Sequence, residues 1–142
     1  MDDLLAKRVL GHAAQAARTP FSYATGHDCA QRFIGDWVLA EVGLDPAKAW
    51  RGRYRTGLGC QRLLRRSGGL VAVLAEALEG VGLVRTENPA LGDVGAVMMQ
   101  SEYRIEPVGA LMGPDGWLSL TGRGIRSTQA DRFVAAWSVP HG

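Results

Sequence analysis

The residue best placed to do chemistry in this sequence is Cys29, which stands where a loop gives way to an amphipathic helix. Residues 20–29 (PFSYATGHDC) are rich in loop-forming residues, and apolar side chains then recur at helical spacing. Asp28 is the expected N-cap, because its side chain can accept hydrogen bonds from the free N–H groups of the first turn. A thiol in that turn faces those groups and the positive end of the helix dipole, which both favour the thiolate. The pattern therefore predicts a candidate nucleophile.

Taken alone, a cysteine at the start of an apolar helix is more often part of the core than a catalyst. Free cysteine is among the most buried residue types and often packs as a small hydrophobe. The sulfur would then lie at the start of one buried helix face, formed by the apolar residues Phe33, Ile34, Trp37 and Val38. Periodicity alone leaves both interpretations open, so the surrounding motifs must decide between them.

Three short segments follow one another in a suggestive order. Residues 20–29 carry a proline, two spaced aromatic residues and a terminal Asp-Cys pair; residues 89–97 read PALGDVGAV, and residues 108–113 read VGALMG. In this order the segments resemble the NlpC-type cysteine peptidases, papain-like endopeptidases of cell-wall hydrolases and phage tail tips. The resemblance extends over about residues 20–121. It implies that Cys29 holds the nucleophile position, at the start of a helix packed on an antiparallel sheet.

The same resemblance places the other catalytic positions on residues that lack the required chemistry. The histidine expected directly before VGALMG is replaced by Pro107, which can neither accept nor orient a proton. The third position, which orients the histidine, falls near Ser119. The oxyanion-binding tyrosine corresponds to Phe21, and the serine after the nucleophile corresponds to Ala30. The resemblance therefore implies a degenerate site in which only Cys29 is retained.

Three histidines could in principle replace the missing base. His27 lies two residues before Cys29 and is the candidate, although it can reach the sulfur only if the turn folds back. His12 is expected to be a partly exposed structural residue, and His141 to lie in a disordered terminus. Amide cleavage also needs an acid for the leaving amine. The sequence therefore favours a site without peptidase activity.

Length and composition indicate one domain, residues 1–142, with a single core. No apolar run is long enough to span a bilayer, and the start MDDLL is acidic where a signal peptide would be basic. We therefore expect the chain to be made in the cytoplasm. Cys29 and Cys60 are expected to stay reduced, and no spacing of cysteine and histidine predicts a metal site. No glycine motif for phosphate or dinucleotide binding is present, so we expect no cofactor.

The expected elements run from helices to strands, which indicates an α+β fold with N-terminal helices packed on a C-terminal antiparallel sheet. Helices are expected at residues 2–17, capped by Asp2 or Asp3, and at 28–42, 59–66 and 69–78, with one helical turn at 46–50. Strands are expected at residues 94–99, 105–112 and 117–121. Residues 133–139 are expected to form an edge strand, since Pro140 can end it without breaking a ladder. With Cys29 at a helix start, this is the NlpC/papain-like arrangement.

A basic segment occupies the middle of the chain. Residues 46–75 contain no acidic residue and carry +7 from one lysine and six arginines, whereas the whole chain carries +2. Arginine and aromatic residues are enriched at protein interfaces. We therefore expect a contact surface for other subunits that includes Trp50, Arg51, Arg53, Tyr54 and Arg55. A solvated face and a nucleic-acid surface are the alternatives, and the small total charge argues against a dedicated DNA-binding protein.

Three functions are compatible with these features. The first is a structural component of the tail tip or baseplate of a tailed phage or phage-like particle, with a peptidase fold and no activity. Such a protein would be assembled in the bacterial cytoplasm, reside in the virion and contact other tail-tip proteins or peptidoglycan. The second is an active peptidoglycan endopeptidase with Cys29 as nucleophile. The third is a nucleic-acid-contacting module that uses residues 51–66. The missing histidine favours the first.

Overall fold

The computed structural model describes residues 3–100 and 104–141, where helices precede strands as the change of periodicity predicted. The helices are α1 (Asp3–Ala17), η1 (Cys29–Ile34), α2 (Gly35–Val42), α3 (Gly57–Arg66) and α4 (Leu70–Gly80). The strands are β1 (Val84–Arg85), β2 (Val94–Gln100), β3 (Ile105–Gly113), β4 (Gly116–Thr121), β5 (Gly124–Thr128) and β6 (Ala135–Ser138). The expected α+β class and the three expected strands between residues 94 and 121 are confirmed.

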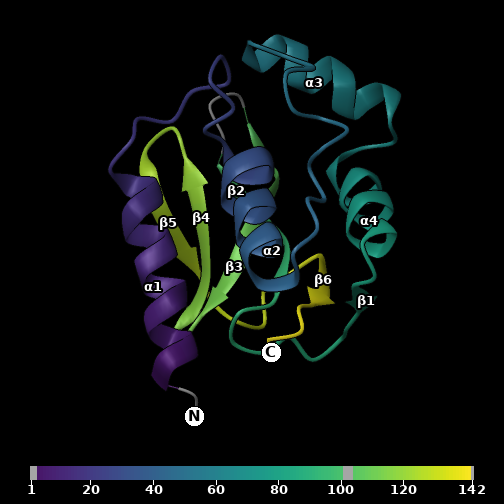
Figure 1. Ribbon diagram of the computed structural model, residues 1–142. Helices are drawn as coiled ribbons and strands as arrows, with labels where there is room; N and C mark the ends of the chain where they lie inside the picture. Colours follow the sequence, from purple (N-terminus) through teal and green to yellow (C-terminus); the bar gives the residue numbers. More distant parts are fainter. Residues whose placement is uncertain (1–2, 101–103, 142) are drawn as a thin grey trace.

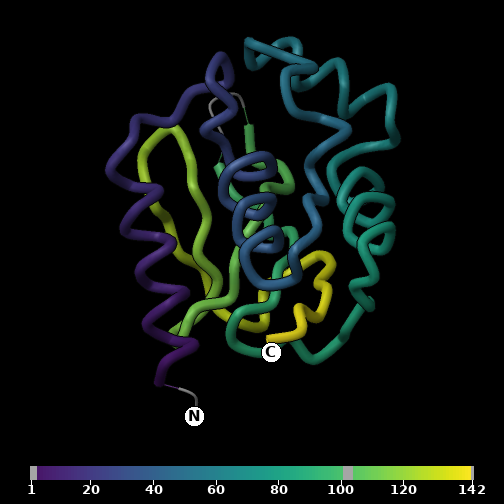
Figure 2. Tube along the Cα trace, in the orientation of Figure 1, coloured from purple at the N-terminus to yellow at the C-terminus, as the bar shows by residue number. Residues whose placement is uncertain are grey.

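The strands form one antiparallel sheet in the order β1-β6-β2-β3-β4-β5. Helix α1 contacts β3, β4 and β5, whereas α4 contacts β1, β2 and β3. Between them η1 packs on β3 and β4, and Figure 1 shows α2, which continues η1, in front of the sheet. Figure 2 shows the chain passing from α1 through η1 and α2 and then out to α3 and α4 on the other side. The helix that begins with Cys29 is therefore the central one.

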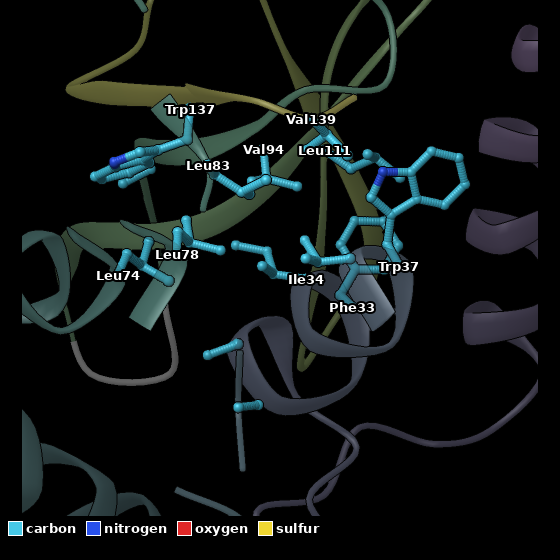
Figure 3. Packing of buried hydrophobic residues seen from close by; sticks show 14 of the residues in the cluster. Phe33, Ile34, Trp37, Leu74, Leu78, Leu83, Val94, Leu111, Trp137 and Val139 are labelled. Carbon is cyan, nitrogen blue, oxygen red and sulfur yellow. The ribbon is translucent and has the colours of Figure 1, made fainter. Parts of the chain in front are cut away.

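The main hydrophobic core joins η1, α2 and α4 to the sheet. Phe33, Ile34 and Trp37 are buried, and Figure 3 shows Ile34 between Trp37 of α2 and Leu78 of α4. The indole N–H of Trp37 donates to the carbonyl of Gly92 at 2.9 Å, so its one polar atom is satisfied inside the core. Each such side chain contributes about 1.5–3 kcal/mol when fully buried. The prediction that Cys29 opens a buried helix packed on the sheet that contains β2 and β3 is confirmed.

The predicted helix over residues 28–42 is present as two joined segments with different hydrogen bonding. The N–H of Phe33 donates to the carbonyl of Asp28, and the N–H of Gly35 donates to that of Ala30, which are π-helical bonds. From Gly35 the helix is α-helical, and it ends at Gly43 with the left-handed φ of 86° that glycine adopts readily. Apolar spacing predicted one helix because it does not distinguish a π turn from an α turn.

The prediction that residues 133–139 form an edge strand is wrong. β6 lies inside the sheet, between β2 and the two-residue strand β1. Val84 and Arg85 of β1 are exposed, and a strand this short shows no alternation in the sequence. β5 was likewise not predicted, since its exposed residues do not form an apolar run. Pro140 follows β6 and removes no ladder hydrogen bond.

The other predicted helices agree with the structure to within two residues at each end. α3 begins at Gly57 because the hydroxyl of Thr56 accepts from the N–H of Gly59 at 3.0 Å and caps the helix. Residues 46–50 form the expected helical turn, in which the N–H groups of Trp50 and Arg51 donate to the carbonyl of Ala47. Asp2, one of the two caps expected for α1, lies outside the described residues. No helix in the described ranges has the length and apolarity needed to cross a bilayer.

Candidate functional site

Cys29 is the first residue of η1, directly above the middle of β3. The Asp28 carboxylate accepts from the N–H groups of Ala30 and Gln31 at 3.1 and 2.8 Å, which confirms the predicted N-cap. The thiol sulfur in turn accepts a hydrogen bond of 3.3 Å from the backbone N–H of Gly109. Two sets of contacts therefore fix the position of the sulfur: the N-cap of η1 and the hydrogen bond from strand β3.

Gly109 makes this close approach possible. A Cβ at that position would lie 2.7 Å from Cδ1 of Ile34 and 3.1 Å from the carbonyl oxygen of Cys29. The 2.7 Å contact is closer than real Cβ atoms come, so with any other residue here Cδ1 of Ile34 would have to shift, and the Cys29 carbonyl would have to give by a few tenths of an ångström. The glycine in the VGALMG segment therefore has a packing role that the sequence analysis missed.

A cavity of about 60 Å³ adjoins the Cys29 sulfur. Its wall is formed mainly by apolar and aromatic side chains, with Phe21 and Tyr23 from the loop before Cys29 and leucines from α3 and α4. Phe21 and Tyr23 meet edge to face, with ring centroids 4.9 Å apart. Cys60 of α3 also lines the cavity, so both thiols of the chain face one space. This volume has room for a few water molecules or one small apolar group.

Pro107 of β3 lines the same cavity as Cys29. The position at which the resemblance requires a histidine therefore lines the cavity that Cys29 lines, and the side chain there has no titratable group. No histidine lines the cavity among the described residues. Glu106, the neighbour of Pro107, is held by the side-chain amide of Gln61 at 2.9 Å.

The structure does not bring His27 and Cys29 together as base and nucleophile. The Nε2 atom of His27 is 2.7 Å from the carbonyl oxygen of Ala16, and the ring is buried against α1. His27 lines a different hollow, together with His12 of α1. The turn before Cys29 therefore directs this histidine to α1 and away from the cavity.

Ser119 does not occupy the position of an orienting residue. Its hydroxyl donates to the carbonyl of Gly109 at 2.5 Å, and the side chain is fully buried. Ser119 does not line the cavity, whereas Leu120 and Thr121 of the same strand do. Ser119 instead strengthens the contact between β4 and β3.

The surroundings of Cys29 favour the neutral thiol. Burial raises its pKa far above the ordinary value, the carboxylate of Asp28 raises it further, and the hydrogen bond from Gly109 offsets only part of this. Burial likewise raises the pKa of Cys60 to about 12. The expectation of a thiolate stabilised by the helix start is therefore wrong: the first N–H groups are already bound to Asp28, and no cation compensates for burial in the described cavity wall.

Asp28 connects the site to the basic segment. The hydroxyl of Tyr54 donates to Oδ2 of Asp28 at 2.7 Å, and the Gln31 side-chain amide donates to the same atom at 3.2 Å. Burial nevertheless raises the pKa of the Asp28 carboxyl, because desolvation outweighs these hydrogen bonds. Tyr54 is therefore an internal part of the site, and nothing in its local sequence indicated a partner at position 28.

The predicted contact surface is only partly exposed. Trp50 and Tyr54 are buried, at 9 and 8% exposure, and so do not belong to a surface. Arg51 is also engaged, since its guanidinium binds Asp36 at 2.9 Å and Asp45 at 2.8 Å. Arg53 and Arg55 are exposed. The basic segment has no internal acid, but the fold supplies two from outside it.

The two remaining histidines have structural roles. His12 lies on Phe33, with its Nε2 atom 2.8 Å from the Phe33 carbonyl oxygen, which confirms the prediction for this residue. His141 is not part of a disordered terminus. Its Nδ1 atom is 2.7 Å from Oε1 of Glu41, and its ring is 6.0 Å from that of Trp37. A tilted ring contact with Trp37 and the contact with Glu41 of α2 thus hold this end of the chain in place.

A family model described as "Domain of unknown function (DUF6950)" matches residues 5–139. The chain belongs to this family. No curated protein and no solved structure matches the chain. The DUF6950 match covers both halves of the candidate site, the helix that carries Cys29 and the strands that carry Pro107 and Thr121. Among the residues described, no group of three histidine, cysteine or acidic side chains is arranged to hold a metal ion.

Proposed function

We propose that this chain is a structural component of the tail tip or baseplate of a tailed phage or phage-like particle, with an NlpC-type, papain-like fold and no peptidase activity. The absence of activity is inferred from Pro107, which lines the same cavity as Cys29 and takes the place at which the resemblance requires a histidine. The assignment to a phage particle rests on the resemblance of the three segments to the NlpC-type family.

The architecture supports the papain-like part of the proposal. A cysteine opens a central helix, the helix packs on an antiparallel sheet, and the adjacent strand β3 passes the sulfur at Gly109. Cys29 and Pro107 line one cavity, which supports assigning them the places of a nucleophile and of its base. This shared placement depends on the packing of η1 on the sheet and not on the identity of residue 107.

The chemistry of the site supports the absence of hydrolysis. A protonated thiol is a poor nucleophile, and no described side chain in the cavity wall combines a proton-accepting ring with access to the sulfur. Glu106 is the acidic side chain nearest to Pro107 in the chain, but it is bound to Gln61. An active peptidoglycan endopeptidase would need both a base for Cys29 and an acid for the leaving amine.

The experiment replaces Cys29 by Ala in the complete particle. We expect Cys29→Ala particles to assemble and infect like the wild type, whereas particles lacking the chain fail to form functional tails. Cys60→Ala is the matched control, because it removes the other thiol of the same cavity. Normal assembly combined with a loss of infectivity in Cys29→Ala alone would show that the thiol acts chemically. That result would favour the active endopeptidase, as would release of peptide fragments from purified peptidoglycan by the wild-type protein.

A further inference from the structure

A second hollow, which shares Tyr54 with the wall of the Cys29 cavity, lies between residues 24–26 and 51–55. It has a volume of about 230 Å³ and is lined by three arginines, Arg32, Arg51 and Arg55. The other described lining residues are uncharged, so no carboxylate side chain faces the hollow from its wall. The hollow is therefore a concave site lined by three guanidinium groups, two of which are ion-paired to acids outside its wall.

The three guanidinium groups keep donors available for a ligand. Arg51 uses Nε and Nη2 for Asp45 and Asp36, and Arg32 uses Nη1 for Asp36, while their remaining N–H groups have no partner among the described residues. Arg55 has no hydrogen bond or ion pair to any described residue. Two arginines are thus held in position by acids behind them, and the third is free to close on an anion.

Two glycines keep this hollow open. Gly26 and Gly52 both line it, with left-handed φ values of 75° and 78°. A Cβ at Gly52 would point into open space, and one at Gly26 would lie 3.1 Å from Oε1 of Gln31. Backbone without side chains at these two points leaves room for a ligand to reach the arginines.

We infer that this hollow binds a compact oxyanion, a carboxylate or a phosphate group, through Arg32, Arg51 and Arg55. A guanidinium group presents paired N–H donors that match the two oxygens of either group. Asp36 and Asp45, which lie against Arg51, would repel a long phosphate chain running past the hollow, so a single anionic group fits better than a nucleic acid. This site shares no arginine with the Cys29 cavity, and the inference does not depend on the proposed phage function.

The test titrates inorganic phosphate and, separately, succinate into the full chain at constant ionic strength, with backbone amide shifts recorded by NMR. We expect saturable shifts at Gly26 and Gly52 with at least one of the two anions, and comparison of the two separates phosphate from carboxylate. Arg55→Gln should weaken binding about tenfold, as expected for loss of a charged hydrogen-bonding group. Arg53→Gln is the matched control, because Arg53 is exposed and adjacent but does not line the hollow.

Several outcomes would overturn the inference. Shifts that do not saturate with either anion would show that no site exists. Equal weakening by Arg53→Gln and Arg55→Gln would show only a diffuse positive surface. Tighter binding of a single-stranded oligonucleotide than of either small anion, reduced equally by both variants, would point to a nucleic-acid surface. Neither variant replaces a residue with a described ion pair, so both are expected to fold, and thermal unfolding of each checks this.

Discussion

Single residues decide how closely the helix carrying Cys29 approaches the sheet. Asp28 binds the first N–H groups of η1 and Gly109 removes the side chain that would separate η1 from β3. Together they place the sulfur within hydrogen-bonding distance of a strand N–H. The same burial that fixes the position of the thiol raises its pKa, so a well-defined geometry and a protonated sulfur have one physical cause.

The first prediction concerns Gly109. We expect Gly109→Ala to lower the free energy of unfolding by about 1–3 kcal/mol, because the added methyl group overpacks the contact with Ile34 and the Cys29 carbonyl. Urea denaturation measures this change. Gly11→Ala is the matched control: its Cβ meets nothing within 4 Å in the middle of α1, so we expect it to stabilise the protein by about 0.5–1 kcal/mol. Equal stability of the Gly109→Ala variant and the wild type would mean that η1 does not pack closely on β3.

For single residues, the local sequence could predict the role of a side chain only where its interaction partner is also close in the sequence. The cap at Asp28 was predictable because its acceptors serve N–H groups two and three residues ahead. The hydrogen bond from Tyr54 to Asp28 and the ion pairs of Arg51 could not be predicted, because they join segments that are distant in the sequence and meet only in the folded chain. The short motif around Ser119 likewise does not show which residues of β4 reach the cavity, since that depends on how the helices pack on the strand.

Among the elements, α3 differs from the other helices in how it is held. Its one buried residue is Gly57, and Leu58 is 62% exposed, whereas α4 buries Leu70, Val73, Leu74 and Leu78. The inner side of α3 nevertheless covers the Cys29 cavity through Cys60, Leu63 and Leu64. Figure 1 shows α3 at the upper end of the molecule, beyond the ends of the other helices. The cavity is thus closed on one side by the helix with the fewest buried side chains.

The second prediction is that α3 opens before the rest of the fold. We expect backbone amides of α3 to exchange with deuterium at least about tenfold faster than those of α4, because local opening of α3 exposes little buried apolar surface. Hydrogen exchange followed by mass spectrometry measures both helices in one experiment. They are nearly equal in length, so helix length does not explain a difference. Equal protection of the two helices would show that α3 is an integral part of the core.

Element types were predictable from periodicity, whereas element positions in the sheet were not. The apolar runs of β2, β3 and β4 are long enough to show their character, and their bounds were close to those observed. β1 has two residues and no such pattern, yet its pairing with β6 changes β6 from an edge strand to an interior one. The place of a strand in a sheet depends on which strands pair with it, and this cannot be predicted from the residues of that strand alone.

Over the whole molecule, folding brings acidic side chains from other parts of the chain against the basic segment. Residues 46–75 carry +7 along the chain, but Asp36 and Asp45 from outside this segment neutralise part of it at Arg51. The guanidinium also lowers the pKa of the Asp45 carboxyl through their hydrogen bonds. A triple charge reversal at Arg51, Arg53 and Arg55 would therefore combine damage to the fold with loss of a surface. The three arginines must be tested separately.

The last prediction follows from the difference between Arg51, which is ion-paired, and Arg53, which is exposed. Arg51→Glu should lower the free energy of unfolding by about 1–2 kcal/mol, since it breaks two ion pairs and places a third carboxylate beside Asp36 and Asp45, with partial exposure screening the charges. Arg53→Glu should change it by less than about 0.5 kcal/mol, because Arg53 is exposed and has no ion pair among the described residues. Urea denaturation of both variants at low and high salt measures the contrast, and the deficit of Arg51→Glu should shrink as salt screens the repulsion. If both reversals cost the same, Arg51 is a surface charge like its neighbour, and the basic segment keeps its full charge for a partner.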